Sequence, residues 1–213
     1  MTEQKKLWQG EFGTEYAKRN VITEEQSRAR RLLWDNIIKN IYFSTKFLPT
    51  TFLEVGAGIG ANLMAINEIL TTDNMPKASY SFSATEINPT AIDVLKFNVP
   101  GINLLDTDKL NKFTNSFDLV FTSGVLIHIH PAHRMQLMRN IYHASRRFVI
   151  AIEYFAPETR GIKYRGVDNA LWLDDYGSIY LDNFGLRLIS YGFCWKKVTG
   201  LDNVTYWIFE KTN

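Results

Sequence analysis

An acidic residue followed by three closely spaced glycines forms the most chemically specific pattern in the sequence, Glu54-Val55-Gly56-Ala57-Gly58-Ile59-Gly60. Glycine has no Cβ and tolerates positive φ, so such a loop can turn sharply and let a ligand approach its backbone. Dinucleotide-binding loops space their glycines as G-x-G-x-x-G and place a pyrophosphate over a helix N-terminus. Here the third glycine comes one residue early, and the carboxylate of Glu54 would repel a pyrophosphate. That carboxylate could instead attract the ammonium group of a methionine moiety.

A second carboxylate, Glu86, lies 26 residues after Gly60, at the end of a predicted strand. A carboxylate at that strand end can accept hydrogen bonds from both hydroxyls of a ribose. The alternative is that the glycines form only a tight turn and that Glu86 is a surface side chain. The whole pattern predicts a cofactor site formed by Glu54, Gly56, Gly58, Gly60, Glu86 and Ile87.

Two further loops follow predicted strands at the same edge of the sheet. Asp106 and Thr107 come after a weakly marked strand, where a carboxylate could accept a hydrogen bond from an adenine amino group. An Asx-turn made by Asp106 explains the pattern equally well. The backbone of Ser123 and Gly124, after the next strand, is expected to lie beside the same ligand.

A histidine and a glutamate are the candidate catalytic residues. His128 comes soon after Gly124, and the ordinary pKa of histidine lies near neutrality, which suits a general base. The alternative is a histidine that packs beneath the site and orients the loop. Glu153 ends a predicted strand, so it could orient an acceptor hydroxyl or amine. Pairing with a nearby arginine is the alternative for Glu153.

Short apolar runs alternate with helical patterns through most of the chain. Strands are predicted at 52–55, 80–85, 101–105, 117–121, 148–152, 187–198 and 204–210. Helices are predicted at 9–20, after a capping box that begins at Thr23, and at 61–70, 89–98 and 131–145. This alternation predicts an α/β, Rossmann-like fold with a mostly parallel seven-stranded sheet and helices on both faces. The turn at 200–203 predicts that the C-terminal strand is antiparallel.

These elements divide the chain into an N-terminal helical arm or cap at 1–48 and a Rossmann-like domain at 49–213. Residues 155–175 show no clear element, and long loops are often lids or binding loops. We therefore expect a lid-like insertion over the site at 155–175.

The composition fits one soluble domain of 213 residues, because 46% of the residues are hydrophobic and 14% are aromatic. A net charge of +2 predicts neither a nucleic-acid nor a membrane partner, and the basic run at 27–31 is interpreted as a solvated helix face. One cysteine and four scattered histidines predict no disulfide and no metal site. The sequence shows no secretory leader and no membrane-spanning run, so we expect a cytoplasmic protein.

The opening of the chain resembles that of the pseudaminic acid biosynthesis-associated methylases. The similar residues are Trp8-Gln9-Gly10-Glu11-Phe12-Gly13 with Tyr16, Arg19 and Asn20, then Gly124-Val125-Leu126-Ile127-His128-Ile129, Glu153-Tyr154, Tyr164-Arg165-Gly166 and Tyr191-Gly192-Phe193. The resemblance implies a class I methyltransferase that uses S-adenosylmethionine and releases S-adenosylhomocysteine. It also implies a small acceptor that is acidic or sugar-like, such as a nonulosonic acid, another surface-polysaccharide sugar or a precursor.

Further side chains are assigned by their place in the arm, at a strand end and in the insertion. Tyr16 and Tyr154 are expected among the substrate-binding residues, and Tyr16 could close the pocket by packing on the cofactor. Ordinary helix packing is the alternative for Tyr16. Tyr164 and Arg165 could bind an acidic substrate group, because arginine matches a carboxylate or phosphate with two hydrogen bonds. A surface loop arginine is the alternative. Arg19, in the arm, is predicted at the methionine carboxylate of the cofactor.

Three other functions are compatible with the sequence. A nicotinamide-dependent oxidoreductase shares the fold but differs in the spacing of its loop. A methyltransferase acting on RNA or protein fits the same pattern, although the near-neutral charge disfavours RNA. A non-catalytic S-adenosylmethionine-binding protein would keep the same loop, because a fold alone does not establish catalysis.

Overall fold

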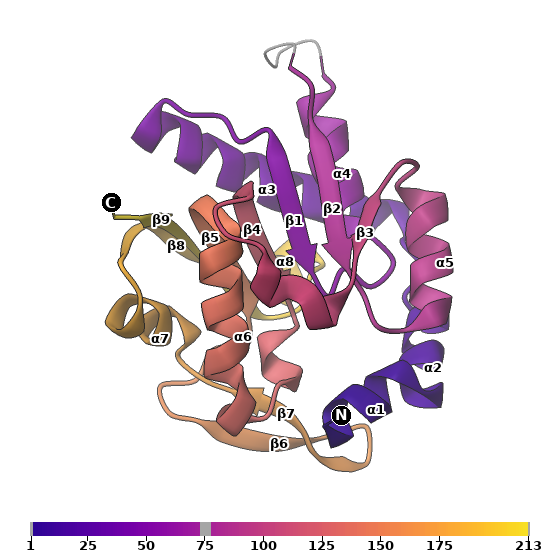
Figure 1. Cartoon of the computed structure of the whole chain (residues 1–213). Helices are drawn as coiled ribbons and strands as arrows, with labels where there is room; N and C mark the ends of the chain where they lie inside the picture. Colours follow the sequence, from indigo (N-terminus) through magenta and orange to yellow (C-terminus); the bar gives the residue numbers. More distant parts are fainter. Residues whose placement is uncertain (1, 73–77, 213) are drawn as a thin grey trace.

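The computed structural model describes residues 2–72 and 78–212, and it contains a seven-stranded sheet (Figure 1). The strand order is β3-β2-β1-β4-β5-β9-β8. The strands are β1 (Thr51–Val55), β2 (Ser81–Thr85), β3 (Asn103–Leu105), β4 (Phe117–Ser123), β5 (Ser145–Glu153), β8 (Leu186–Cys194) and β9 (Val204–Lys211). β1 to β5 pair in parallel, whereas β9 is antiparallel to both β5 and β8. The predicted fold class is confirmed, including the antiparallel C-terminal strand.

Helices cover both faces of this sheet. One face packs against α3 (Glu24–Thr45), α4 (Ala61–Leu70) and α5 (Pro89–Asn98), and the other against η1 (Thr107–Lys112), α6 (Pro131–Ala144) and α7 (Tyr176–Asn183). Side chains alternate between the faces of a strand, so Phe52 is buried toward α3 while Leu53 is buried toward α6. Burial on both sides explains why these strands read as apolar runs.

Helix α3 belongs to the core of the domain. Thr23 and Gln26 form the predicted capping box, in which the Thr23 hydroxyl accepts from the Gln26 backbone N–H at 3.2 Å. Trp34, Ile37 and Ile41 are fully buried in the same cluster as the sheet. The structure therefore places α3 in the helix layer, and only α1 (Glu3–Gln9) and α2 (Glu11–Arg19) form a separate arm.

Asn88 holds this arm to the carboxyl end of β2. Its side-chain amide donates to the carbonyl oxygen of Trp8 at 3.0 Å, and lies 3.2 Å from the Thr14 hydroxyl. The other end of the same side chain accepts from the Ala91 N–H at 3.1 Å and caps α5. Gly13 packs closely against the end of α1. A Cβ atom at Gly13 would lie only 1.9 Å from the Trp8 carbonyl oxygen. A glycine at this position thus lets α2 pack against the end of α1.

The 155–175 segment contains a β-hairpin, so the prediction that it has no clear element was wrong. β6 (Arg160–Tyr164) and β7 (Val167–Leu173) form a two-stranded antiparallel sheet. Arg165 and Gly166 form its two-residue turn, with φ of 50° and 84°. Such a turn requires positive φ at both residues and usually holds asparagine or aspartate before glycine. Arginine at the first position explains why the sequence did not reveal the hairpin.

Other boundaries also differ from the sequence prediction. Helices α1 and α7 were not predicted, although Asp175 caps α7 by accepting from the Ser178 N–H at 2.9 Å. The strand predicted to reach residue 198 ends at Cys194, and the short helix α8 (Lys196–Thr199) follows it. In Figure 1 the arm and the β6–β7 hairpin lie at the end of the sheet to which the carboxyl ends of β1 and β2 point.

We expect Gly13→Ala to detach the arm, because its Cβ would overlap the Trp8 carbonyl oxygen and crowd the Asn88 amide at 2.9 Å. Overpacking of this kind costs on the order of 1–3 kcal/mol. Limited proteolysis with trypsin should then cut the exposed Arg19 faster than in the wild type.

Gly161→Ala is the matched control, because its Cβ would make only an ordinary contact, 3.6 Å from Trp172. Equal rates of cleavage at Arg19 in Gly13→Ala and the wild type would contradict this account of the arm.

Candidate active site

The glycine loop joins β1 to α4, where the strand order reverses between β1 and β4. All three glycines have positive φ, 73° at Gly56, 55° at Gly58 and 83° at Gly60. A Cβ at Gly58 would meet open space, which leaves this part of the backbone accessible to a ligand. A Cβ at Gly60 would lie 2.6 Å from the Leu95 Cδ1 atom. Gly60 therefore lets the end of the glycine loop pack closely against α5.

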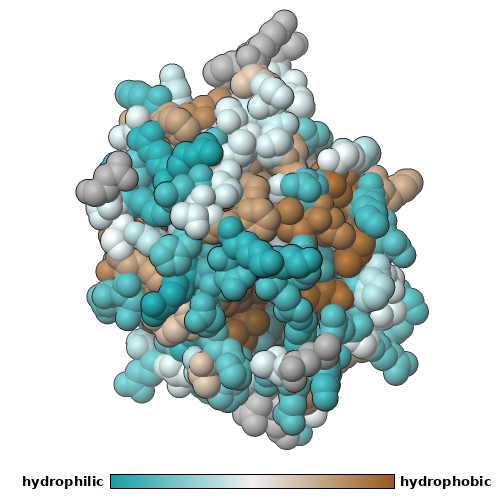
Figure 2. All heavy atoms as spheres, in the orientation of Figure 1, coloured by the Kyte–Doolittle hydropathy of each residue, from teal (hydrophilic) through white to brown (hydrophobic). Residues whose placement is uncertain are grey.

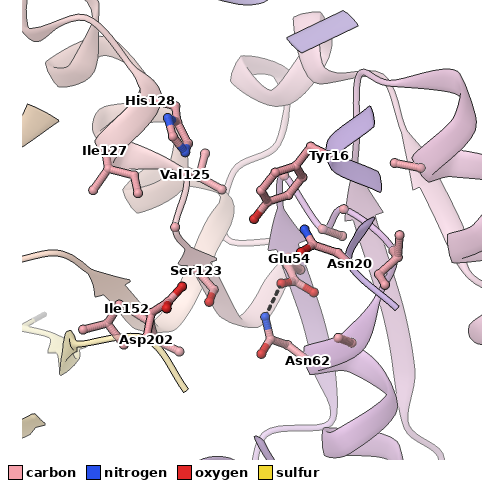
Figure 3. A pocket seen from close by; sticks show the side chains of 18 of the residues that line it. Tyr16, Asn20, Glu54, Asn62, Ser123, Val125, Ile127, His128, Ile152 and Asp202 are labelled. Carbon is pink, nitrogen blue, oxygen red and sulfur yellow. Dashed lines mark hydrogen bonds between the residues drawn. The ribbon is translucent and has the colours of Figure 1, made fainter. Parts of the chain in front are cut away.

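A cavity of about 440 Å³ opens at the carboxyl ends of β1 and β4, beneath the arm. Figure 3 shows that Tyr16, Glu54, Ser123, His128 and Asp202 surround the same space. The predicted site residues that line it are Tyr16, Glu54, Gly56, Gly58, Glu86, Ile87, Ser123, Gly124, His128, Tyr154 and Tyr164. Open α/β sheets bind ligands in this crevice, at the topological switch point.

Glu54 supplies the buried carboxylate of this cavity. Its side chain is 1% exposed, and its Oε1 accepts from the Asn62 amide at 2.8 Å (Figure 3). The Asn62 side chain is held in turn by the indole N–H of Trp34 at 3.2 Å. Oε2 has no hydrogen-bond partner among the described residues. Burial raises the pKa of Glu54 to about 8, against the lowering effects of Asn62 and Arg30.

Glu86 lies at the end of β2 and lines both this cavity and a smaller one beside it. Its Oε2 accepts from the Gly58 N–H at 2.7 Å, and its Oε1 from the N–H groups of Ile87 at 2.7 Å and Asn88 at 2.9 Å. The carboxylate is thereby fixed between the glycine loop and the start of α5. It is positioned for a ligand that spans the two cavities.

The smaller cavity, about 280 Å³, contains Asp106 and Thr107. Asp106 makes the Asx-turn that was the alternative prediction, accepting from the Asp108 N–H at 2.9 Å. The hydroxyl of Thr107 is buried without a hydrogen-bond partner among the described residues. The apolar side chains of this cavity are Ile87, Ile92, Leu104 and Leu105. Figure 2 shows a hydrophobic area on the right of the molecule, where Figure 1 places β2, β3 and α5.

His128 lies in η2 (Leu126–His128), directly after the β4 loop. Its ring packs 4.4 Å from that of Trp8 and 5.4 Å from that of Tyr164. Nδ1 lies 2.8 Å from the Ala170 carbonyl oxygen, and a carbonyl can only accept, so Nδ1 carries the proton. Burial lowers the pKa of His128 to about 4. The neutral ring therefore has an unprotonated Nε2, which can accept a hydrogen bond.

Glu153 has a different place from the one expected for a catalytic residue. Its fully buried carboxylate accepts from the N–H groups of Val125 and Leu126, both at 3.2 Å, and lies 3.5 Å from the Ile127 nitrogen. Burial raises the pKa of Glu153 to about 7, while these backbone hydrogen bonds lower it. Glu153 lies outside the cavity lining of the described chain, so it positions the β4 loop from behind.

Two predicted arginines also lie outside both cavities in the described residues. Arg19 is exposed at the end of α2, and Arg165 is exposed at the hairpin turn. The Arg165 guanidinium lies over the ring of Tyr164, 5.6 Å from its centroid. These placements correct the expectations that Arg19 reaches the cofactor and that Arg165 reaches the acceptor.

The three tyrosines assigned to acceptor binding line the cavity. Tyr16 comes from α2, Tyr154 follows β5, and Tyr164 ends β6. Burial raises the pKa of Tyr16, and burial together with the nearby Asp202 carboxylate raises that of Tyr154. Both phenols therefore stay protonated at neutral pH and can donate hydrogen bonds.

Arg30 is the main cavity residue that the sequence prediction missed, because the basic run at 27–31 was interpreted as a solvated face. Arg30 is half-buried and lines the cavity. The sequence did contain a sign that Arg30 is partly buried. Arg30 precedes Leu33 and Ile37 by three and seven residues, so it lies on the same face of α3 as these apolar side chains.

The fold is shared with known methyltransferases. Magnesium protoporphyrin IX methyltransferase from Synechocystis PCC 6803 with bound SAM superposes with a TM-score of 0.68 at 12% identity, over 100% of this chain and 99% of that one. The 1,6-didemethyltoxoflavin-N1-methyltransferase from Burkholderia thailandensis has a TM-score of 0.65 and 13% identity, over 94% of this chain and 85% of that one. The plantazolicin methyltransferase BpumL in complex with SAH has a TM-score of 0.66 and 10% identity, over 98% of this chain and 94% of that one. The chain has the class I methyltransferase fold.

A family model described as "Mitochondrial small ribosomal subunit Rsm22" matches residues 35–165, more than half of the chain. The chain belongs to this family. The Rsm22 model is not the sugar-methylase family that the N-terminal residues resemble, and that resemblance has no support from the matches described here. A comparison with curated proteins gives no match. None of the described helices of this Rsm22-family chain is long and apolar enough to cross a membrane.

We expect His128 to stay neutral, with its proton on Nδ1, down to about pH 5, because its pKa lies near 4 and Ala170 accepts from Nδ1. Long-range 15N–1H NMR spectra recorded from pH 8 to pH 5 measure both properties. The His128→Gln spectrum assigns the signal. A proton on Nε2, or titration near pH 6.5, would contradict the geometry.

Proposed function

We propose that this Rsm22-family chain is an S-adenosylmethionine-dependent methyltransferase. The observation that carries the proposal is Glu54, which lines the cavity at the glycine loop and whose buried Oε2 atom has no hydrogen-bond partner among the described residues. A buried carboxylate oxygen without a hydrogen bond is costly, so its presence favours a ligand that supplies a donor. The ammonium group of a methionine moiety supplies one with the matching charge.

The other predicted residues fit the rest of the cofactor in order along the two cavities. Glu86 would accept hydrogen bonds from the ribose hydroxyls at the junction between them. Ile87 would pack on the adenine, and the unpartnered hydroxyl of Thr107 would hydrogen-bond its edge. Ser123 and Gly124 would line the path between the ribose and the acceptor.

When bound, the cofactor supplies a methyl group on a sulfonium, which is displaced in line by the acceptor atom and leaves a neutral thioether. The protein then has to align and shelter the acceptor. His128 Nε2 can accept a hydrogen bond from an acceptor hydroxyl or amine and so orient its lone pair toward the methyl group. A pKa near 4 makes His128 a weak base, which favours this orienting role.

RNA of a small ribosomal subunit is the acceptor that we propose first, because the family description names that subunit. The acceptor cavity lies under the arm, so an RNA base would have to be extruded from its stack to enter it. A small molecule is the second candidate. It is favoured by the aromatic wall formed by Trp8, Tyr16 and Tyr164, and an acidic sugar remains within this second class.

Binding of S-adenosylhomocysteine should release a proton near pH 7. Glu54, with a pKa of about 8, is mostly protonated in the free protein, and the ligand ammonium favours the ionised form. The affinity should therefore rise between pH 6 and pH 8. Calorimetry in buffers of different ionisation enthalpy measures the released proton.

Glu54→Gln should bind the same ligand at least about tenfold more weakly and release no proton, because a charged hydrogen bond is lost. Glu68→Gln, a change on the outer side of α4, is the control and should behave as the wild type. Equal proton release by Glu54→Gln and the wild type would remove the basis of the cofactor proposal.

Transfer of a radioactive methyl group from labelled S-adenosylmethionine distinguishes the acceptors. One reaction contains small ribosomal subunits from cells that lack the gene, and the other contains a low-molecular-mass extract of the same cells. Label in ribosomal RNA supports the first candidate, and label in the extract alone supports the second. If S-adenosylhomocysteine binds tightly but label enters neither, the chain is a non-catalytic binding protein and the enzymatic proposal is wrong.

A further inference from the structure

Arg30 lines the cavity and has no ion-pair partner among the described side chains. It lies in the second turn of α3, and its guanidinium donates one long hydrogen bond, from Nη1 to the Gln26 carbonyl oxygen at 3.4 Å. Among the side chains that the structure describes, which exclude those of 73–77 and 168–169, no carboxylate lies within ion-pair distance of it. Burial lowers the pKa of Arg30, while the charge of Glu54 raises it. Most of the donors of a partly desolvated guanidinium are thus left for a ligand.

The other cations near the cavity are already engaged or absent from its wall. Lys196 lines the cavity but pairs with Asp202 at 3.0 Å. Arg19 is exposed at the end of α2, outside the lining. His128 is neutral, because burial lowers its pKa to about 4. Arg30 is therefore the available positive group on the wall that the structure describes.

Glu54 and Arg30 place a carboxyl group and a cation at one cavity with no hydrogen bond or ion pair between them among the described residues. The Glu54 Oε2 atom and most Arg30 donors stay unbonded, and burial keeps Glu54 mostly protonated until a ligand ammonium favours its ionised form. The ionised pair is complementary to a zwitterion, in which an ammonium and a carboxylate are joined through one carbon. An amino-acid end has this chemistry, and arginine binds carboxylates with two parallel hydrogen bonds.

We infer that Arg30 forms a carboxylate-binding subsite, which holds the methionine carboxylate of the cofactor while Glu54 holds its ammonium group. This inference rests on the proposed function. It assigns to α3 the role that the sequence suggested for Arg19 in the arm. It also places the methionine end of the ligand against α3, so that the opposite wall, with His128 and Tyr164, is left for the acceptor.

Two ligands that differ in one group test the subsite. S-adenosylhomocysteine carries the carboxylate, and S-adenosyl-3-thiopropylamine, its decarboxylated form, lacks only that group. Arg30→Gln should bind S-adenosylhomocysteine roughly 10- to 100-fold more weakly, as expected for the loss of charged hydrogen bonds, but should bind the decarboxylated ligand within about twofold of the wild type. Arg30→Lys should recover part of the loss.

Arg31→Gln is the matched control, because Arg31 pairs with Glu68 at 2.9 Å on the surface of the same helix. It should bind both ligands as the wild type does. Circular dichroism melts of each variant verify that α3 is folded.

Equal weakening of both ligands by Arg30→Gln would show a merely structural role and overturn the inference, as would unchanged affinity for S-adenosylhomocysteine. If the wild-type protein binds neither ligand, the proposed function itself fails. The two failures can be told apart, because the wild-type protein still binds S-adenosylhomocysteine when only the inference about Arg30 is wrong.

Discussion

Glu54 is held at the end of β1 with one carboxylate oxygen bonded to Asn62 and the other bonded to none of the described residues. A rise of its pKa from 4.5 to about 8 corresponds to a free energy on the order of 5 kcal/mol against ionisation in the ligand-free protein. The sheet, α4 and the Trp34–Asn62 contact all act to keep this side chain in place. Much of the cavity is thus organised around a carboxyl group whose ionised form the protein alone does not compensate.

The cavity has two chemically different ends. Near the glycine loop the wall is polar and charged, with Glu54, Glu86 and Arg30. Toward the arm and the β6–β7 hairpin the rings of Trp8, His128 and Tyr164 pack against one another. A methyl donor held at the polar end would face an acceptor sheltered at the aromatic end. The aromatic end depends on segments outside the sheet, so acceptor choice can differ between proteins that share the fold.

The sequence predicted the sheet and α3 to α6 well, because each buried strand is a short apolar run and each of these helices has buried apolar residues. The limits of α4 and α5 agree with the structure residue for residue. The glycine loop and Glu86 were recognisable because local backbone geometry and strand order fix them. The β6–β7 hairpin was missed because its turn begins with Arg165 at positive φ. Glu153 could not be assigned correctly, because its backbone partners Val125 and Leu126 are distant in sequence. The place of Arg19 depends on how the arm packs, whereas the helical spacing of Arg30 was available in the sequence.

Asn88 has a consequence for how the molecule can move. One end of its side chain caps α5, two residues after Glu86, and the other end holds the carbonyl oxygen of Trp8 in the arm. Its backbone N–H also donates to the Glu86 carboxylate. Lifting the arm therefore breaks hydrogen bonds at the residue that follows the junction of the two cavities. The side chain and backbone of Asn88 thus tie the position of the arm to the Glu86 carboxylate at the junction of the two cavities.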